Sequence, residues 1–266
     1  MLIPIQSVSA LPLTVKHFNY NSNQYSYSNT IRDQITDPNN FGPNGIVKDV
    51  SFNFENVPGI TAENLAGADI FIAAFPYIAN GITQTITTAQ AQMLKDFVTQ
   101  GGSLIVNSDI FPDSGSNVIG SLFGPLIFSG GETVGSITIN DSGKAPGITN
   151  GPFGDVRSLS WHSNYTTSIS NGGDSTIIDD YGLVSYINPT STSGSVVFLA
   201  DANVFHYDSI HYTGDWKSLR LNIFSYSANS SRINNPIPEP ATMALFGLGL
   251  LGLAGIGRRK TSHSQN

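Results

Sequence analysis

The sequence has no cysteine, and only 12 % of its 266 residues are charged. The absence of cysteine excludes disulfides, thiolate zinc sites, a cysteine nucleophile and iron–sulfur clusters. The charged fraction is about half of what soluble domains usually carry. The polar surface must therefore consist mainly of Ser, Thr, Asn and Gln, a composition that is common in exported proteins.

Positive charge is scarcer than negative charge, with 12 Lys and Arg against 19 Asp and Glu and a net charge of −7. Nucleic-acid binding requires a basic surface that neutralises phosphates, so we predict no nucleic-acid partner. The sequence also lacks a G-x-S-x-G elbow, which leaves no serine nucleophile of that type. Its length suits one large domain with a sizeable core.

Residues 241–257 form an apolar run without any charged side chain. As a helix, the run would extend about 25 Å, at the low end of the range for membrane-spanning helices. Arg258, Arg259 and Lys260 follow it at once, and such basic residues favour the cytoplasmic side of a membrane. We predict a transmembrane helix with the C-terminus in the cytoplasm of a bacterium and the body outside. A buried core helix is the alternative, although it would normally keep a polar face.

The motif Pro238-Glu239-Pro240 precedes this run. The order of Pro-Glu-Pro, apolar helix and basic cluster over residues 238–262 resembles the PEP-CTERM sorting tail of bacterial exported proteins. The resemblance implies that an exosortase-type enzyme in the membrane is a partner. It also implies cleavage near Pro238, Glu239 and Pro240, and transfer of the body to the cell envelope or extracellular matrix.

The rest of the chain divides into three parts. Residues 1–10 end in Val8-Ser9-Ala10, which has the form of a signal-peptidase site, so we predict a truncated signal peptide there. An ordinary lead-in to a strand is the alternative. Residues 11–228 are the predicted body domain, and the Asn- and Ser-rich residues 229–237 are the predicted linker.

The clearest unit of the body is strand, helix and strand. The apolar residues 68–74 predict a buried strand. A helix with Thr88 as its cap carries the apolar stripe Ala89, Met93, Leu94, Phe97 and Val98 and ends at Gly101-Gly102. Residues 103–106 then predict a second strand, which completes a right-handed βαβ unit.

The remaining apolar patterns predict further elements along the body. We expect strands at 13–18, 46–54, 134–139, 156–159, 175–178, 183–187 and 196–200, and helices at 29–35, 62–66 and 216–227. The predicted fold is α/β, with a mostly parallel, flavodoxin-like sheet, helices on both faces, extra β-hairpins and the C-terminal transmembrane helix.

The order of Ala68-Asp69, buried strand, helix, Gly101-Gly102 and second strand is similar to that of the class I glutamine-amidotransferase-like group. This group includes the ThuA-like proteins, and the resemblance covers residues 45–110 and 195–228. Amidotransferases of this group carry a cysteine at a strand-to-helix elbow. Since this chain has none, the resemblance implies the scaffold and excludes the amidotransferase activity.

Polar side chains follow two of the predicted strands. Asp109 comes after strand 103–106, and Asp201 and His206 come after strand 196–200. Open α/β sheets bind ligands beyond the carboxyl ends of their strands, where such a cluster can hold a divalent cation or supply a general base. Alternatively, the aspartates cap turns. We predict no cofactor and no bound metal ion.

Trp161 lies in a polar stretch, where its ring can stack on a sugar or pack on the core. Three functions therefore stay open. The first is a non-catalytic, membrane-anchored and then sorted envelope protein. The second is an exported hydrolase or sugar-processing enzyme of ThuA-like shape. The third is an extracellular glycan-binding module with a polysaccharide partner.

Overall fold

The computed structural model describes residues 11–20, 25–75, 85–109, 115–139, 145–205 and 212–234. These belong to one compact unit, Leu11–Asn235. The predicted signal peptide, the sorting motif, the basic cluster and the predicted transmembrane helix all lie outside the described residues. Among the helices that are described, none combines the length and the apolar character needed to cross a membrane.

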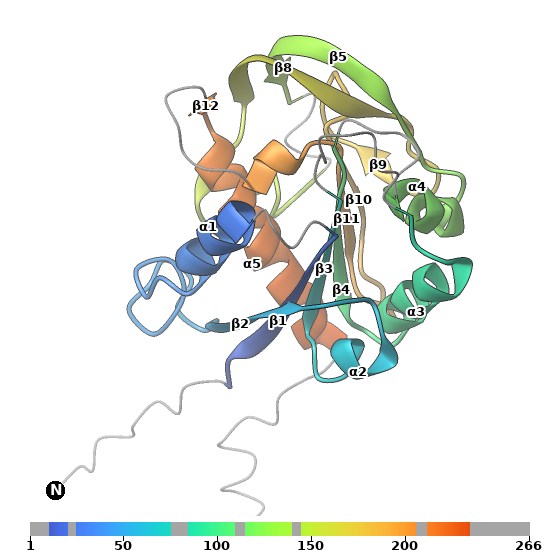
Figure 1. The fold of residues 1–266 in the computed structure, drawn as a ribbon. Coiled ribbons are helices and arrows are strands. Elements are labelled where there is room, and N and C mark those ends of the chain that lie inside the picture. Colours follow the sequence, from blue (N-terminus) through green and yellow to red (C-terminus); the bar gives the residue numbers. More distant parts are fainter. Residues whose placement is uncertain are drawn as a thin grey trace, which may run out of the picture. The chain divides into compact units, whose positions relative to one another are not determined.

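A seven-stranded sheet with the strand order β2-β1-β3-β4-β11-β10-β9 forms the centre of the body (Figure 1). Its strands are β1 (Leu13–Asn19), β2 (Phe52–Val57), β3 (Ile70–Ala74), β4 (Ser103–Asn107), β9 (Thr176–Ile177), β10 (Val184–Ile187) and β11 (Val196–Leu199). Strands β1, β2, β3, β4 and β11 are parallel, whereas β10 is antiparallel to both of its neighbours, β11 and β9. The parallel strands, numbered along the chain, have the order 2-1-3-4-5 of flavodoxin-like sheets. The predicted α/β fold with a mostly parallel sheet is confirmed.

In the described part of the chain, five α-helices pack around this sheet. They are α1 (Tyr25–Ile35), α2 (Ala62–Leu65), α3 (Thr88–Thr99), α4 (Gly115–Gly120) and α5 (Trp216–Asn234). Helices α1 and α5 contact each other and the strands β2, β3 and β4. Helix α3 contacts β4 and packs against α2 and α4. Figure 1 shows these two groups on opposite sides of the sheet.

The unit β3–α3–β4 forms as predicted, with a shift of one residue at the helix cap. The Thr87 hydroxyl accepts a hydrogen bond from the Gln90 amide, and the Gln90 side chain accepts one from the Thr87 amide. This capping box places the cap at Thr87 rather than at the predicted Thr88. Gly101 follows the helix with a positive φ of 99°, which glycine adopts without strain.

A smaller antiparallel sheet lies beside the carboxyl ends of the parallel strands (Figure 1). It consists of β5 (Ile127–Thr138), β8 (Ser158–Asn171) and β12 (Tyr212–Gly214). The Thr167 hydroxyl of β8 donates a hydrogen bond to the Ala200 carbonyl just after β11. Strands β5 and β8 are longer than predicted, because three register shifts interrupt their pairing and hide the alternation in the sequence.

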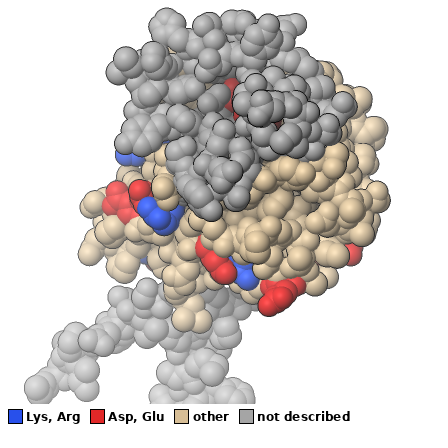
Figure 2. Space-filling model, in the orientation of Figure 1, with Lys and Arg blue, Asp and Glu red and all other residues tan. Residues whose placement is uncertain are grey.

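The remaining short elements connect these parts. A two-stranded hairpin consists of β6 (Asn150–Gly151) and β7 (Gly154–Asp155), and two 3₁₀ turns are η1 (Ser121–Phe123) and η2 (Ala202–Phe205). Figure 2 shows scattered acidic and basic side chains on a mostly uncharged surface, as the low charged fraction predicts.

The predicted linker at 229–237 is wrong for residues 229–234, because α5 continues to Asn234. Ser230 and Ser231 are buried in its last turns. The Ser230 hydroxyl donates to the Tyr226 carbonyl one turn earlier, and the Ser231 hydroxyl donates to the Asp69 carbonyl. These bonds satisfy polar groups inside the protein, so a serine-rich sequence can continue the helix.

Two other boundaries also differ from the prediction. Strand β2 begins at Phe52 instead of residue 46, because residues 39–47 form a loop closed by backbone hydrogen bonds between Ile46 and Asn39 and between Gly42 and Val47. Helix α1 begins at Tyr25 instead of residue 29.

Candidate functional site at the carboxyl edge of the sheet

The carboxyl ends of β1, β3, β4 and β11 lie next to one another and form a continuous edge, which we call the carboxyl edge. The backbone ladder extends past the strands themselves. Its amide-to-carbonyl hydrogen bonds run from Tyr20 to Ala74 (3.0 Å), from Phe75 to Asn107 (2.8 Å) and from Ser108 to Leu199 (2.8 Å). Residues that follow each strand are therefore held in a fixed register along this edge.

The half of the edge formed by β4 and β11 is polar and buried. Asn107, Ser108 and Asp109 follow one another at the end of β4, and Asp201 lies just beyond β11; all four are buried. Asn107 pairs with Leu199, so Asp109 and Asp201 come two residues after the same point on adjacent parallel strands. Strands β4 and β11 are parallel neighbours, and the convergence of these side chains stays a prediction.

His206, the third predicted member of the cluster, lies outside the described residues. In the described part of the chain, no group of three or more His, Asp or Glu side chains is arranged to hold a metal ion.

The side-chain oxygen of Asn107 is a buried polar atom at this edge that has no hydrogen-bond partner among the described residues. Leaving such an atom unsatisfied costs about 1–3 kcal/mol, and native proteins retain few of them. An uncompensated amide oxygen on the edge that also carries Asp109 and Asp201 is a feature more typical of a ligand-binding site than of a core built for stability.

Helix α4 closes over the end of β4. The hydroxyls of Ser108 and Ser116 lie 2.8 Å apart and are hydrogen-bonded. A Cβ atom on Gly115 would lie 2.4 Å from the Phe75 ring, so only glycine allows α4 to approach the edge this closely. Neither Ser116 nor Phe75 was predicted from the sequence. The glycine at position 115, the first residue of α4, was the feature of the sequence that could have indicated this close approach.

The half of the edge formed by β1 and β3 is aromatic. The ring centroids of Phe18, Tyr20 and Phe75 lie 6.2–6.3 Å apart. Phe18 is in edge-on contact with both other rings, which is a favourable geometry for aromatic pairs. Along the strand order, the edge thus changes from aromatic side chains to amide, hydroxyl and carboxylate groups.

Asp179 is a buried carboxylate with a different role, in the turn before β10. Its Oδ1 atom accepts hydrogen bonds from the amides of Tyr181, Gly182 and Leu183, and its Oδ2 atom accepts one from Val184. Burial raises the pKa of this carboxyl, and the four amide donors oppose that shift. The carboxylate is fully used in fixing the turn, so we assign it a structural role.

His17 is also buried, within β1. Its Nδ1 atom lies 3.1 Å from Oδ1 of Asn56, and its ring lies 5.8 Å from that of Phe54. Burial lowers the pKa of His17 to about 4, although the hydrogen bond to Asn56 acts in the opposite direction. The imidazole is therefore neutral at neutral pH and belongs to the sheet interior.

The backbone of Trp161 lies in β8, where it pairs with Tyr212 of β12. Its side chain is outside the described residues. Sugar stacking by Trp161 therefore stays a prediction.

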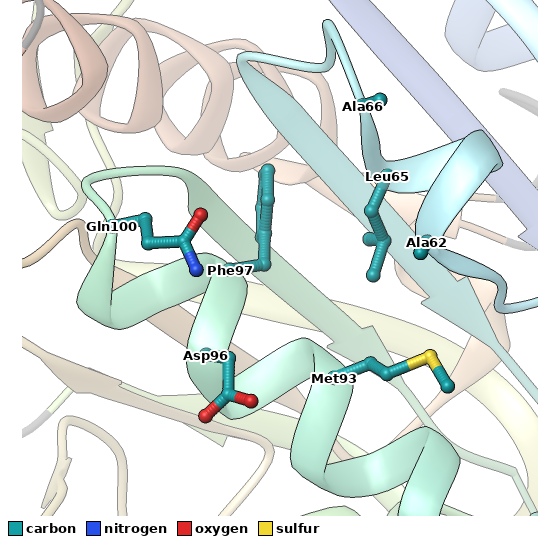
Figure 3. Close-up of a pocket in the computed structure, with 7 residues that line it drawn as sticks. All are labelled: Ala62, Leu65, Ala66, Met93, Asp96, Phe97 and Gln100. Carbon is teal, nitrogen blue, oxygen red and sulfur yellow. The ribbon is translucent and has the colours of Figure 1, made fainter.

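A groove of about 320 Å³ lies between α2 and α3, away from the carboxyl edge (Figure 3). Its lining consists of Ala62, Leu65, Ala66, Met93, Asp96, Phe97 and Gln100. The predicted apolar stripe of α3 is rotated, because Ala91, Leu94 and Val98 are the buried residues of the helix and Met93 is 36 % exposed. With a single carboxylate in its lining, this groove holds no pair of groups for acid–base chemistry.

Comparison with known proteins identifies the C-terminal segment. Residues 236–260 match the model of the PEP-CTERM protein-sorting motif. Among curated proteins, none matches this chain.

Several solved structures are similar to the chain at low sequence identity. A cytoplasmic protein from Salmonella typhimurium has 10 % identity and a TM-score of 0.49, covering 81 % of this chain and 99 % of that protein. A ThuA-like protein from Bacteroides uniformis has 9 % identity and a TM-score of 0.48, covering 86 % and 94 %. A β-galactosidase from the Antarctic haloarchaeon Halorubrum lacusprofundi has 11 % identity and a TM-score of 0.46, covering 84 % of this chain but 31 % of the enzyme. The sequence match shows that the chain carries a PEP-CTERM sorting motif, as predicted, and this motif implies exosortase-dependent export.

Proposed function

We propose that this protein is anchored in the bacterial inner membrane by residues 241–257 and is then cut by an exosortase-type enzyme and sorted. In the anchored form, the body lies outside the cytoplasm and the C-terminus lies inside. The mature body acts in the cell envelope or extracellular matrix without catalysis, and an extracellular polysaccharide is its proposed partner. The observation that carries the proposal is the sorting motif at residues 236–260.

The physical properties of the tail support this order of events. The apolar run has no charge, and one Lys or Arg at the centre of such a helix would cost about 2.5–3.5 kcal/mol on insertion. Arg258, Arg259 and Lys260 favour the cytoplasmic side and stop transfer of the chain. Glu239 lies before the run, where an enzyme acting outside the cytoplasm can reach it.

Fractionation of cells that carry single variants tests the proposal. Leu250→Arg, at a position within the apolar run, should abolish membrane retention. Glu239→Gln should leave the chain inserted but unprocessed, because this side chain lies outside the run. Glu63→Gln, which changes an exposed carboxylate of α2, serves as the matched control and should be retained and processed normally. Normal processing of the Glu239 variant would contradict the proposal.

The carboxyl edge favours a second candidate function, an exported hydrolase or sugar-processing enzyme. The supporting observation is that Asp109 and Asp201 are buried after adjacent parallel strands, on the edge that carries the unpartnered oxygen of Asn107. In this candidate, one carboxylate acts as the general base and the pair orients the substrate.

Hydrolysis of a panel of glycosides by the purified protein tests this candidate. Asp109→Asn and Asp201→Asn should each abolish turnover. Asp180→Asn should retain it, since this carboxylate is exposed and accepts a hydrogen bond from the Thr138 amide at the C-terminal end of β5. If the wild-type protein turns over none of the glycosides under any condition, the hydrolase candidate is wrong and the non-catalytic role remains.

A further inference from the structure

The described body ends at the edge of the sheet opposite to the candidate site. In the last turn of α5, the Ser231 hydroxyl donates to the carbonyl of Asp69, the residue before β3. The neighbouring Arg232 side chain donates to the Asp49 carbonyl in the loop that leads to β2. The chain therefore leaves the body at the amino ends of β2 and β3, which we call the amino edge.

The two most exposed large apolar side chains among the described residues lie at this same edge. They are Leu11, which is 72 % exposed, and Ile46, which is 57 % exposed. Leu11 precedes β1, whose Leu13 amide bonds the Ser51 carbonyl at the start of β2. Ile46 lies in the loop between α1 and β2, the loop that Arg232 contacts.

The loop that carries Ile46 is held in a defined conformation. The Ile46 amide donates to the Asn39 carbonyl at 3.1 Å, and the Gly42 amide donates to the Val47 carbonyl at 3.0 Å. The Phe41 ring anchors the loop in the core, with its centroid 4.9 Å from that of Phe52. Ile46 is therefore presented to solvent by a fixed loop.

The length of the segment between α5 and the apolar run limits how far the amino edge can lie from a membrane. Residues 235–240 separate the end of α5 from the apolar run. Even fully extended, a segment of this length spans roughly 25 Å. With the run inserted in a bilayer, the amino edge is confined to the neighbourhood of the lipid surface.

We propose that the amino edge is a lipid-contacting surface of the uncut protein, with Leu11 and Ile46 entering the boundary between headgroups and acyl chains. The proposal rests on the membrane anchoring proposed above. Side chains at such a boundary enter about 5–10 Å, which suits single exposed Leu and Ile residues. In this orientation, the carboxyl edge stands at least one strand length, roughly 17 Å, farther from the bilayer and faces the extracellular side.

The absence of cysteine allows a direct test, because one introduced thiol gives a unique label. Leu11→Cys and Ile46→Cys would be made in the full chain, with Ile127→Cys as the matched control. Ile127 is also exposed, at 47 %, but lies in β5 of the smaller sheet near the carboxyl edge (Figure 1). Each variant would carry an environment-sensitive fluorophore and be reconstituted in phosphatidylethanolamine–phosphatidylglycerol vesicles, with and without a quencher attached to the lipid.

Flotation of the protein with the vesicles measures whether the chain is anchored. Quenching measures which edge of the body lies at the lipid surface. We expect all variants to float with the vesicles, with loss of fluorescence at positions 11 and 46 and none at position 127. Flotation with equal quenching at all three positions overturns the lipid-contacting edge and leaves the anchoring intact. A failure to float overturns the proposed anchoring and the lipid-contacting edge together.

Discussion

Strand β4 begins and ends with a buried polar residue, and the hydrogen bonding of these two side chains differs. At the amino edge, the Ser103 hydroxyl donates to the Ser227 carbonyl, accepts a hydrogen bond from Ser195 and lies 3.1 Å from the Ser231 hydroxyl. At the carboxyl edge, the Asn107 side-chain oxygen has no partner within the part of the chain that is described. Proteins tolerate such a cost mainly where function requires it. The comparison shows that the amino edge joins α5 to the sheet, whereas the carboxyl edge keeps a buried polar atom that no described residue satisfies.

At the amino edge, Nε of Arg232 is buried without a hydrogen-bond partner among the described residues. The hydroxyl of Ser227 is a second exception, since it is also buried without such a partner. Its cost is smaller than that of Asn107 if the hydroxyl rotates toward a neighbouring carbonyl of its own helix. The contrast between the two edges therefore rests on Ser103 and Asn107, and mutations at these positions test it.

The largest effect is expected at Asp179, the structural carboxylate in the turn before β10. Asp179→Asn replaces an acceptor by an amide donor and leaves at least one of four buried backbone amides unsatisfied. We expect the free energy of unfolding to fall by roughly 3–5 kcal/mol, measured by urea denaturation. Asp180→Asn, at the exposed neighbour, is the control and should cost less than about 1 kcal/mol. Equal effects of both variants would contradict the structural role of Asp179.

The free energy of unfolding should depend on pH through His17, which lies in the interior of the sheet between the two edges. Its pKa is about 4 in the folded protein and 6.5 in the unfolded chain, so the unfolded chain binds the proton more tightly. The free energy of unfolding should therefore be fully maintained above pH 6.5 and decline as pH falls toward 4, by about 3 kcal/mol in all. Denaturation at a series of pH values checks this. A His17→Gln variant should lose this component, and an identical pH profile in both proteins would rule it out.

At the amino edge, Ser103→Ala should be destabilising. The substitution removes the hydrogen bond donated to the Ser227 carbonyl and the one accepted from Ser195, in a site without access to water. We expect a loss of about 2 kcal/mol in the free energy of unfolding, because the Ser195 hydroxyl loses its acceptor and the Ser227 carbonyl loses a donor. The exposed Ser121→Ala in η1 is the matched control, with little expected change.

The smallest effect on stability is expected at the other end of the same strand. Asn107→Leu replaces a buried, unpartnered amide oxygen by an apolar group of similar size. The free energy of unfolding should change by less than about 1 kcal/mol in either direction. If this variant is destabilised more than Ser103→Ala, the contrast between the two edges is wrong.

The parts of the fold that depend on local signals were predictable from the sequence. The β3–α3–β4 unit has a continuous apolar run at 70–74, a cap at Thr87 and a glycine at 101, and each acts within a few residues. The long strands β5 and β8 were predicted only in part, since their pairing contains register shifts that no short window reveals. The end of α5 was missed because its serines form hydrogen bonds with distant parts of the chain.

The candidate site was predictable to a similar extent. Asp109 and Asp201 were identified because polar residues directly follow apolar strands, and the pairing of β4 with β11 places them on one edge. The lack of a partner for the Asn107 side-chain oxygen could not be predicted, because elements far away in the sequence bury this atom. The role of Asp179 depends on four amides that turn toward one carboxylate, a geometry that residue types alone do not encode.

The central claim is that the tail sorts the body and is removed in the process. The mass of the mature protein, purified from the envelope or the medium of wild-type cells, tests it most directly. We expect a mature chain whose C-terminus lies near Pro238-Glu239-Pro240, without the apolar run and the basic cluster. A mature protein that retains Arg258, Arg259 and Lys260 in every fraction would contradict the account.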